Sequence, residues 1–158
     1  MYEYRAKLIK VVDGDTVDVD IDLGFGVWLK DERVRIMGID TPESRTSNKV
    51  EKVFGLAAKY RLKDLLGKDC TLKTFAAKDG EDMKGKFGRI LGDFYCYYQP
   101  EDREMLVTEI MIKEGHAVKY HGQNKADVET AHLANRNRLM QEGVVDPKDV
   151  QEAEEKMK

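Results

Sequence analysis

The first forty residues carry the hydrophobic pattern of three β-strands. Apolar side chains gather at residues 8–12, and turn-forming residues follow at 13–16. Residues 17–22 read Val-Asp-Val-Asp-Ile-Asp, an alternation typical of a strand with one buried face. Residues 33–39 alternate again. The pattern therefore predicts a three-stranded β-meander.

A helix is predicted next, because apolar residues recur at helical spacing between residues 50 and 66. Asn48 is a suitable N-cap with Glu51 at capping-box spacing, and Gly67 is a suitable stop. The remaining chain predicts two strands, a helix, a short extended piece and another helix. Their expected ranges are 70–76, 89–98, about 105–113, 116–120 and about 126–141.

This order of elements predicts a mainly β protein with helices, of the α+β class. Three strands, a helix and two strands suit a five-stranded OB-fold-like β-barrel, accompanied by about three α-helices. A chain of 158 residues is long enough for one such domain. We expect this domain to span residues 1–145, with a charged C-terminal tail at 146–158.

The net charge of −3 and the sequence pI of about 5.7 argue against a protein that binds nucleic acid through overall basicity. A local basic cleft with a bound cation can still act within an acidic protein. The lysines that are candidates for a rim along a nucleic-acid backbone, or for ordinary solvated surface, are Lys78, Lys84, Lys86, Lys119 and Lys125.

The two cysteines, Cys70 and Cys96, are too few for a disulfide framework, and apolar surroundings favour buried free thiols. No apolar run approaches the roughly 18 residues that a membrane span needs, so no membrane contact is expected. The first residues do not resemble a signal peptide. We therefore expect a cytoplasmic protein, unless a leader has been removed.

Acidic residues flank two turns and are candidates for binding a hard cation. Asp13 and Asp15 surround a glycine, while Asp40 and Glu43 surround Thr41 and a proline that stiffens the turn. Carboxylate, hydroxyl and carbonyl oxygens are the ligands that Ca²⁺ and Mg²⁺ prefer. Either turn, taken alone, is also compatible with a solvated hairpin built from favoured turn residues.

Two arginines stand in apolar strand-like segments. Arg35 precedes the second acidic turn, and Arg89 opens a later strand. The planar guanidinium group fits a phosphate with two parallel hydrogen bonds. Two such groups, a cation and a carboxylate are the parts that hydrolysis of a phosphodiester requires. For each arginine taken alone, a surface ion pair is the favoured interpretation.

The chain resembles the staphylococcal nuclease family in three segments that occur in the family's order. They are Val-Asp-Gly-Asp-Thr at 12–16, Val-Arg-Ile-Met-Gly-Ile-Asp-Thr-Pro-Glu at 34–43 and Gly-Lys-Phe-Gly-Arg at 85–89. Residues 115–120 resemble the family's segment after the second helix. The resemblance covers about residues 5–140, and the three motifs at these spacings form a specific set.

The resemblance implies an OB-fold nuclease that uses Ca²⁺ to cut DNA and RNA with little sequence preference. It implies a phosphate left on the 3′ side of the cut, and a monomer as the family's usual state. The metal site of the family matches Asp15, Asp40 and Thr41 in this sequence. Asp13 matches an acidic residue just outside that shell.

The resemblance also implies roles for residues that contact the substrate. Glu43 matches the carboxylate assigned to the attacking water. Arg35 and Arg89 match the two phosphate-binding arginines, and these three residues are the implied catalytic set. Lys86 matches a lysine near the nucleotide phosphate, and Tyr120 matches a tyrosine that packs beside the nucleotide.

Several segments depart from the best-known pattern of the family. The stretch between Thr16 and Arg35 is longer, and the loop at 44–52 lacks the usual lysine-rich form. Phe87 replaces a tyrosine, and the apolar-aromatic ending is missing after Gln141. These departures concern substrate preference, stability and a possible protein partner, and they leave the implied catalytic set complete.

Three histidines and two aromatic residues are further candidates for a functional role. His116, His121 and His132 lack a zinc-ligand spacing and are expected to be structural or solvated. Phe25 and Trp28 are candidates for stacking on a base, although hairpin packing is favoured.

Two alternatives to a nuclease stay open. One is a catalytically weak or inactive OB-fold module that binds nucleic acid or protein. The other is a structural metal-binding domain without a substrate. Retention of Arg35 and Arg89 favours the enzyme, because a cation does not recruit arginine.

Overall fold

The computed structural model describes residues 2–75 and 89–158. Its N-terminal part is an antiparallel meander of β1 (Glu3–Asp13), β2 (Thr16–Asp22) and β3 (Trp28–Ile36). The strand β2 pairs with both neighbours, and its apolar side chains are buried. The predicted meander is therefore confirmed.

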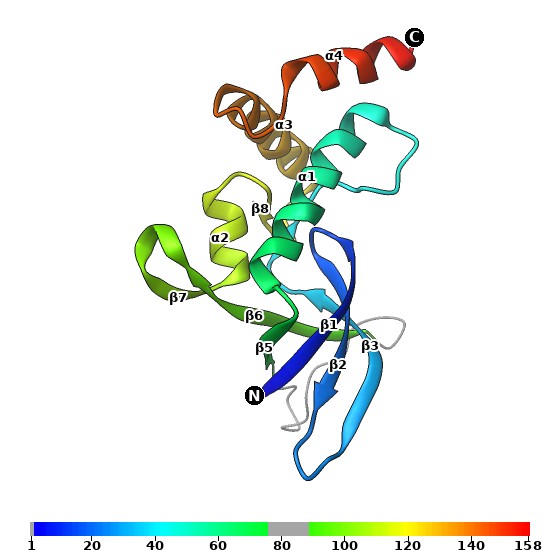
Figure 1. The fold of residues 1–158 in the computed structure, drawn as a ribbon. Coiled ribbons are helices and arrows are strands. Elements are labelled where there is room, and N and C mark those ends of the chain that lie inside the picture. Colours follow the sequence, from blue (N-terminus) through cyan, green and yellow to red (C-terminus); the bar gives the residue numbers. More distant parts are fainter. Residues whose placement is uncertain (1, 76–88) are drawn as a thin grey trace.

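The third strand begins at Trp28, earlier than the predicted residue 33. Residues 28–33 extend the β2–β3 hairpin beyond the rest of the barrel, as Figure 1 shows at the bottom of the view. Their side chains are largely exposed, so no hydrophobic alternation marks this part of the strand.

Two further strands, β5 (Asp69–Thr74) and β6 (Ile90–Tyr98), close the sheet on itself. The strand order is β3-β2-β1-β5-β6-β7, where β7 (Arg103–Leu106) is an outer strand on β6. A parallel pairing of β3 with β6, from Val34 opposite Ile90, joins the two ends into a five-stranded barrel. The predicted OB-like α+β barrel is thus confirmed.

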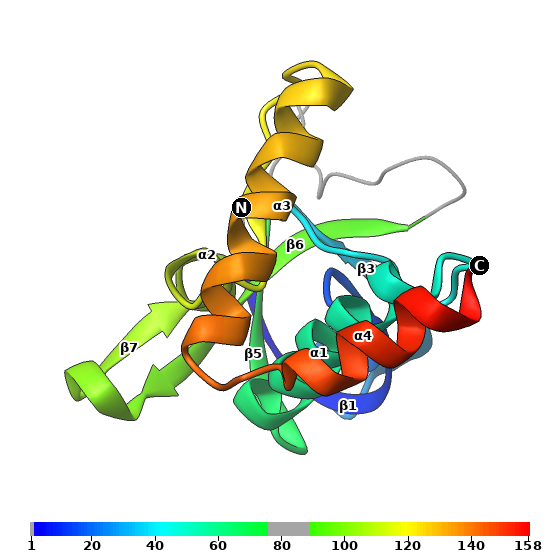
Figure 2. The ribbon, with the colours of Figure 1, turned by 90° about the horizontal axis from the view of Figure 1, so that it is seen from above.

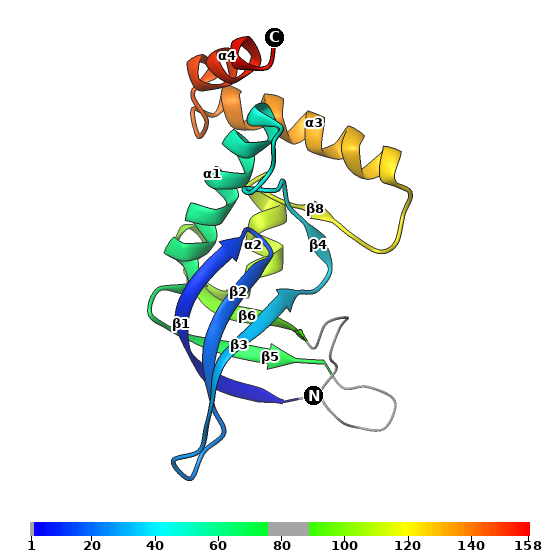
Figure 3. The same ribbon diagram turned by 90° about the vertical axis from the view of Figure 1, so that its right-hand side faces the viewer.

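The helix α1 (Lys49–Leu66) lies against β1 and follows the sequence signals closely (Figure 3). The Asn48 side chain accepts a hydrogen bond from the Glu51 backbone N–H at 3.0 Å. Gly67 takes a positive φ of 63° and donates to the Lys63 carbonyl, which ends the helix. Burial of the apolar face of α1 against the barrel supplies the packing that holds this helix.

The C-terminal half contains α2 (Val107–Lys113), α3 (Lys125–Gln141) and α4 (Pro147–Lys156). The helix α2 begins two residues later than predicted, because Met105 and Leu106 pair with β6. A 3₁₀ turn at Gln99–Glu101 and a two-stranded pair of β4 (Ile39–Asp40) and β8 (Val118–Lys119) complete the described elements.

Among the residues that the structure describes, the buried hydrophobic side chains form two clusters. The larger one fills the barrel and includes Phe94 and Ile36, both fully buried. The smaller one joins α1, α3 and α4 through Phe54, Leu139 and Val150. Figure 2 shows α4 crossing over α1, so the segment expected as a charged tail contributes a helix with a buried face.

Both thiols are free, with Cys96 buried and Cys70 half-buried. Burial raises the pKa of the Cys70 thiol to about 12 and that of the Cys96 thiol to about 11. Neither thiol is ionised near neutral pH, which favours a structural role. In residues 2–75 and 89–158, no helix combines the length and apolar character needed to cross a bilayer.

Candidate metal and phosphate site

The turn between β1 and β2 packs directly onto α1 and onto the second acidic turn. A Cβ atom on Gly14 would lie 2.8 Å from the Ala58 Cβ and 3.0 Å from the Thr41 Oγ1. Only glycine leaves room for both contacts. The two acidic turns, remote in sequence, therefore meet at one point of the helix surface.

Asp15 lies at this meeting point with 14% of its side chain exposed. Its carboxylate accepts hydrogen bonds from the Thr16 hydroxyl at 3.0 Å and the Thr41 backbone N–H at 3.4 Å. The Arg35 guanidinium lies 3.5 Å away. Burial raises the pKa of Asp15, with Arg35 opposing the shift and the nearby Asp40 adding to it. The negative charge of the Asp15 carboxylate is thus only partly compensated by its protein neighbours.

Thr41 supplies an oxygen beside Asp15. The residue is buried, and its Oγ1 has no hydrogen-bond partner among the described residues. A buried hydroxyl without a partner is costly, which makes such an atom a candidate for contact with a bound ion. Oxygen atoms of two carboxylates and a threonine fit a hard cation such as Ca²⁺.

Side chains alone do not complete a metal shell here. In the described part of the chain, no three His, Cys, Asp or Glu residues are grouped so that they could hold a metal ion. A cation at Asp15 and Asp40 would therefore draw further ligands from Thr41 and water. Ca²⁺ tolerates such mixed shells, with six to eight oxygen ligands.

Asp13 connects the first acidic turn to the second through hydrogen bonds. Its Oδ1 accepts a hydrogen bond from the Ser44 backbone N–H at 3.0 Å and another from the Ser44 hydroxyl. Ser44 is buried, so these bonds are shielded from water. The arrangement links the two acidic turns through Asp13 and Ser44.

The closed barrel brings the two arginines to one wall. Arg35 stands opposite Leu91 in the parallel β3–β6 pair, and Arg89 precedes that position by two residues. Because side chains alternate along a strand, Arg35 and Arg89 are expected on the same face. The Arg35 guanidinium is held by the carbonyls of Ile36 and, at 2.9 Å, of Ile39.

Arg89 and Glu43 line two different hollows. Arg89 lines a hollow of about 620 Å³ together with Asp13 and Arg33. Glu43 lines another, of about 710 Å³, together with Asp40, Thr41 and Tyr120. Asp15, Thr41, Asp40 and Arg35 are therefore joined by direct contacts or close charge, while Glu43 and Arg89 line separate hollows.

Gly55 positions Glu43 and is absent from the sequence-based prediction. A Cβ at Gly55 would overlap the Glu43 carbonyl group and lie 2.6 Å from the Ser44 backbone nitrogen. The loop backbone thus rests on the helix backbone. A glycine inside an otherwise regular helical pattern destabilises the helix. Its presence was therefore the one signal in the sequence that another segment approaches the helix closely at this position.

His132, expected from the sequence to be structural or solvated, contacts a residue of the candidate site. Its Nε2 lies 2.7 Å from the Asp40 Oδ2, and the histidine side chain is 14% exposed. The ring comes from α3, 92 residues further along the chain. No local spacing reveals such a contact.

The remaining predicted substrate residues divide by position. Tyr120 is 42% exposed and lines the hollow beside Glu43. Lys119 and Lys125 flank it in sequence, and Lys125 lines the same hollow. Lys86, Lys78 and Lys84 lie outside the described residues.

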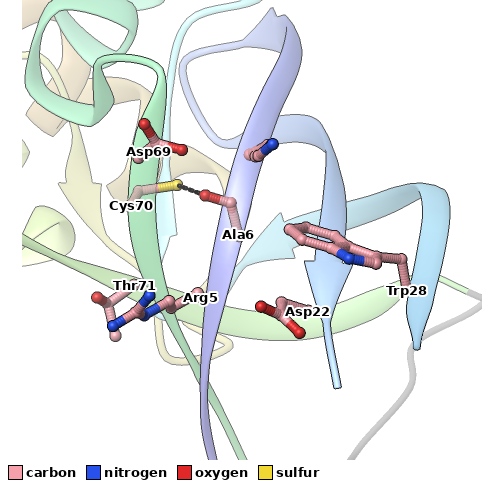
Figure 4. Close-up of a pocket in the computed structure, with 8 residues that line it drawn as sticks. Arg5, Ala6, Asp22, Trp28, Asp69, Cys70 and Thr71 are labelled. Carbon is pink, nitrogen blue, oxygen red and sulfur yellow. Dashed lines mark hydrogen bonds between the residues drawn. The ribbon is translucent and has the colours of Figure 1, made fainter. Parts of the chain in front are cut away.

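Trp28 lines a separate hollow of about 510 Å³, shown in Figure 4. The Nζ atoms of Lys7 and Lys30 lie 5.2 and 5.4 Å from its ring centroid. The indole thus packs against side chains of its own sheet, as the sequence favoured. β2 separates this hollow from the acidic turns by about 20 Å, given its seven residues.

Comparison with known proteins supports the sequence resemblance. The profile of the family described as "Staphylococcal nuclease homologue" matches residues 33–143. A micrococcal nuclease of Shigella flexneri is 31% identical over 126 residues, covering 78% of this chain and 62% of the relative. A thermonuclease of Staphylococcus intermedius is 35% identical over 123 residues, covering 66% and 67%.

A further relative is endonuclease YncB of Bacillus subtilis (strain 168). It is 33% identical over 108 residues, which cover 68% of this chain and 44% of the relative. The chain thus spans between about two fifths and two thirds of the length of these relatives.

Proposed function

Because the chain belongs to the family of staphylococcal nuclease homologues, we propose that it hydrolyses phosphodiester bonds in DNA and RNA with the help of Ca²⁺. The observation that carries the proposal is the contact of Asp15 with both Thr41 and Arg35. It supports the proposal because oxygens that would bind the cation then lie beside the guanidinium group that would bind the phosphate. We further propose that the phosphate remains on the 3′ side of the cut.

In this proposal Asp15, Asp40 and Thr41 hold the ion. When bound, Ca²⁺ supplies positive charge that neutralises the scissile phosphate. Asp13 fixes the relative position of the two acidic turns through Ser44. His132, at 2.7 Å from Asp40, restricts the orientation of that carboxylate.

The arginines act on the phosphate itself. Arg35 and Arg89 donate hydrogen bonds to its non-bridging oxygens, where negative charge grows as water attacks phosphorus. The carbonyls of Ile36 and Ile39 hold Arg35 before substrate arrives, so little reorganisation is needed.

Glu43 is the carboxylate we assign to the attacking water. Its side chain is exposed and lines the hollow beside Asp40 and Thr41, where water and substrate have access. It can orient the water and accept its proton as the oxygen attacks phosphorus. The bond from phosphorus to the 5′ oxygen then breaks, and that oxygen takes up a proton.

The decisive experiment is a digestion time course on plasmid and single-stranded DNA, with Ca²⁺, with Mg²⁺ and with EDTA. We expect degradation with Ca²⁺, none in EDTA, and a loss of at least a hundredfold in the rate for Glu43→Ala, the scale of one general acid–base group. End-group analysis should show 3′-phosphates. Glu154→Ala, a change at an exposed carboxylate on α4, serves as the matched control.

Absence of cleavage in every metal, alongside measurable binding of the DNA, would contradict the proposal. That result would support the OB-fold binding module instead. Full activity of a folded Glu43→Ala protein would remove this residue from the mechanism while leaving the metal requirement to be judged from the EDTA arm.

A further inference from the structure

A second concave surface runs between β1 and the C-terminal half of α1, and it shares no lining residue with the hollows that Glu43 and Arg89 line. Its volume is about 650 Å³. We refer to it as the α1 groove. The residues used in the argument are Ile9, Lys10, Lys59, Tyr60, Lys63 and Lys68. Figure 3 shows β1 and α1 side by side, and the Leu8 backbone N–H donates to the Lys68 carbonyl at 2.9 Å.

The α1 groove is basic in a protein that is acidic overall. Four lysines line it against one carboxylate, Asp64, whereas the whole chain carries a net charge of −3. None of the four ammonium groups forms an ion pair with any residue that the structure describes. Their charge is therefore available to an anionic ligand.

Exposed apolar side chains accompany the lysines. Tyr60 is 59% exposed on α1, and Ile9 is 54% exposed on β1. Ile9 stands at a β-bulge, where the pairing register with β2 shifts between Leu8 and Lys10. Bulges turn a side chain away from the regular face of a sheet. Basic groups interleaved with an aromatic ring are typical of surfaces that track a polynucleotide strand.

The α1 groove begins beside the candidate active site. Lys59 follows Ala58, the residue on which Gly14 of the acidic turn rests. On the other wall, Lys10 precedes Asp13 by three residues, which corresponds to about 10 Å along a strand. A polynucleotide strand that leaves the candidate site behind the first acidic turn would therefore enter this groove.

We propose that the α1 groove binds the phosphate backbone of a polynucleotide strand outside the cleaved bond. This proposal rests on the proposed function, because it takes the substrate to be a nucleic acid. The lysines neutralise successive phosphates, and Tyr60 offers a face for a base. The concave shape between a helix and a strand suits a single strand better than the flat surface of a membrane.

The test compares Lys10→Gln/Lys63→Gln, which removes one exposed lysine from each wall, with Lys148→Gln/Lys156→Gln on α4 as a matched control. Binding of a fluorescent 30-nucleotide single strand is measured by anisotropy in EDTA, at several salt concentrations. We expect weaker binding by the groove variant and a shallower plot of log K against log salt. The slope should fall by about 1.4, at roughly 0.7 for each lost phosphate contact. The control should keep the wild-type slope.

Two further measurements separate this proposal from the activity. Hydrolysis of a small chromogenic phosphodiester in Ca²⁺ should be unchanged in the groove variant, because no lysine of the groove touches the cleaved bond. Equal affinities and salt slopes for wild type and groove variant would overturn the groove proposal. The groove proposal would also be overturned if the groove variant bound DNA as the wild type does but bound phosphatidylserine vesicles more weakly. That result would assign the groove to a membrane. Failure of the wild type to cleave any substrate would contradict the proposed activity alone.

Discussion

Asp93 is a carboxylate whose surroundings favour its neutral form. It is 3% exposed on β6 and accepts hydrogen bonds from the Thr108 hydroxyl at 2.6 Å and the Phe94 backbone N–H at 2.8 Å. Burial nevertheless raises the pKa of Asp93 to about 6, against 3.8 for an unperturbed group. The folded state therefore binds this proton more tightly than the unfolded chain.

The sign of the resulting pH dependence follows. Between pH 3.8 and 6 the unfolded chain releases this proton first, so the free energy of unfolding falls as pH rises and levels off above 6. The fall is about 3 kcal/mol, at 1.36 kcal/mol for each pKa unit. We expect the free energy of unfolding of Asp93→Asn to show no such fall between pH 3.8 and 6. Urea unfolding of both proteins from pH 4 to 7 measures the difference, and parallel curves would contradict the assignment.

The mutual placement of the site residues was the part that the sequence could not predict. The motifs indicated Asp15, Asp40 and Thr41 as candidate metal ligands, because each acidic turn is contiguous in sequence. The contact of His132 with Asp40 joins residues far apart, and nothing in either local pattern selects the partner. Periodicity reports which face of an element is buried, and leaves open what covers it.

At the scale of elements, α1 positions the second acidic turn through the absence of a side chain at Gly55. Replacing glycine by alanine inside a helix ordinarily raises the stability of the folded state by about 1 kcal/mol. Here the added methyl group would meet the backbone of Glu43 and Ser44, which cannot rotate away as a side chain would.

We therefore expect Gly55→Ala to destabilise the protein by about 2 kcal/mol, as overpacked sites do. It should also lower the rate of DNA cleavage, because the Glu43 loop is displaced. Chemical denaturation and the digestion assay test the two effects separately. A stability gain of about 1 kcal/mol, as expected for an unhindered helix position, would show that the loop does not rest on α1.

The elements themselves were largely predictable where their signals are local. Asn48 and Gly67 bound α1 by side-chain capping and by a left-handed backbone, both of which depend on a few neighbouring residues. The start of β3 at Trp28 and the strand at Arg103–Leu106 were missed. Residues 28–33 are mostly exposed at the edge of the sheet, where no buried face imposes a pattern. In the second segment only Met105 is buried, so four residues give too short a pattern to mark a strand.

One half-buried position shows how a polar residue can occupy an apolar stripe. Arg61 follows the helical spacing of the buried residues of α1, and its guanidinium binds Glu114 with distances of 2.6 and 2.8 Å. The Tyr98 hydroxyl donates to the same carboxylate at 2.9 Å. These bonds raise the pKa of Arg61 and link α1 to the end of α2.

At the scale of the whole molecule, the second hydrophobic cluster connects α3 and α4 to the barrel through α1. Leu139 is 2% exposed in this cluster, whereas Leu133 on the same helix is 48% exposed. We expect Leu139→Ala to lower the free energy of unfolding by about 3 kcal/mol, within the range for buried leucines. Leu133→Ala serves as the matched control and should change it by less than about 0.5 kcal/mol.

Calorimetry of the two variants also tests whether the helices unfold with the barrel. A single transition at a lower Tm for Leu139→Ala would show that both clusters form one cooperative unit. A separate early transition would show instead that α3 and α4 melt independently, and with them the contact of His132 with Asp40.

The seam between β3 and β6 consists of three residue pairs, from Val34 opposite Ile90 to Ile36 opposite Gly92. It joins segments far apart in the chain, so loop-closure entropy delays its formation relative to the local hairpins. Arg35 and Arg89 come together only when this seam forms. During refolding, the recovery of cleavage activity would therefore report when the barrel closes. Circular dichroism would detect the helices and hairpins, which form earlier.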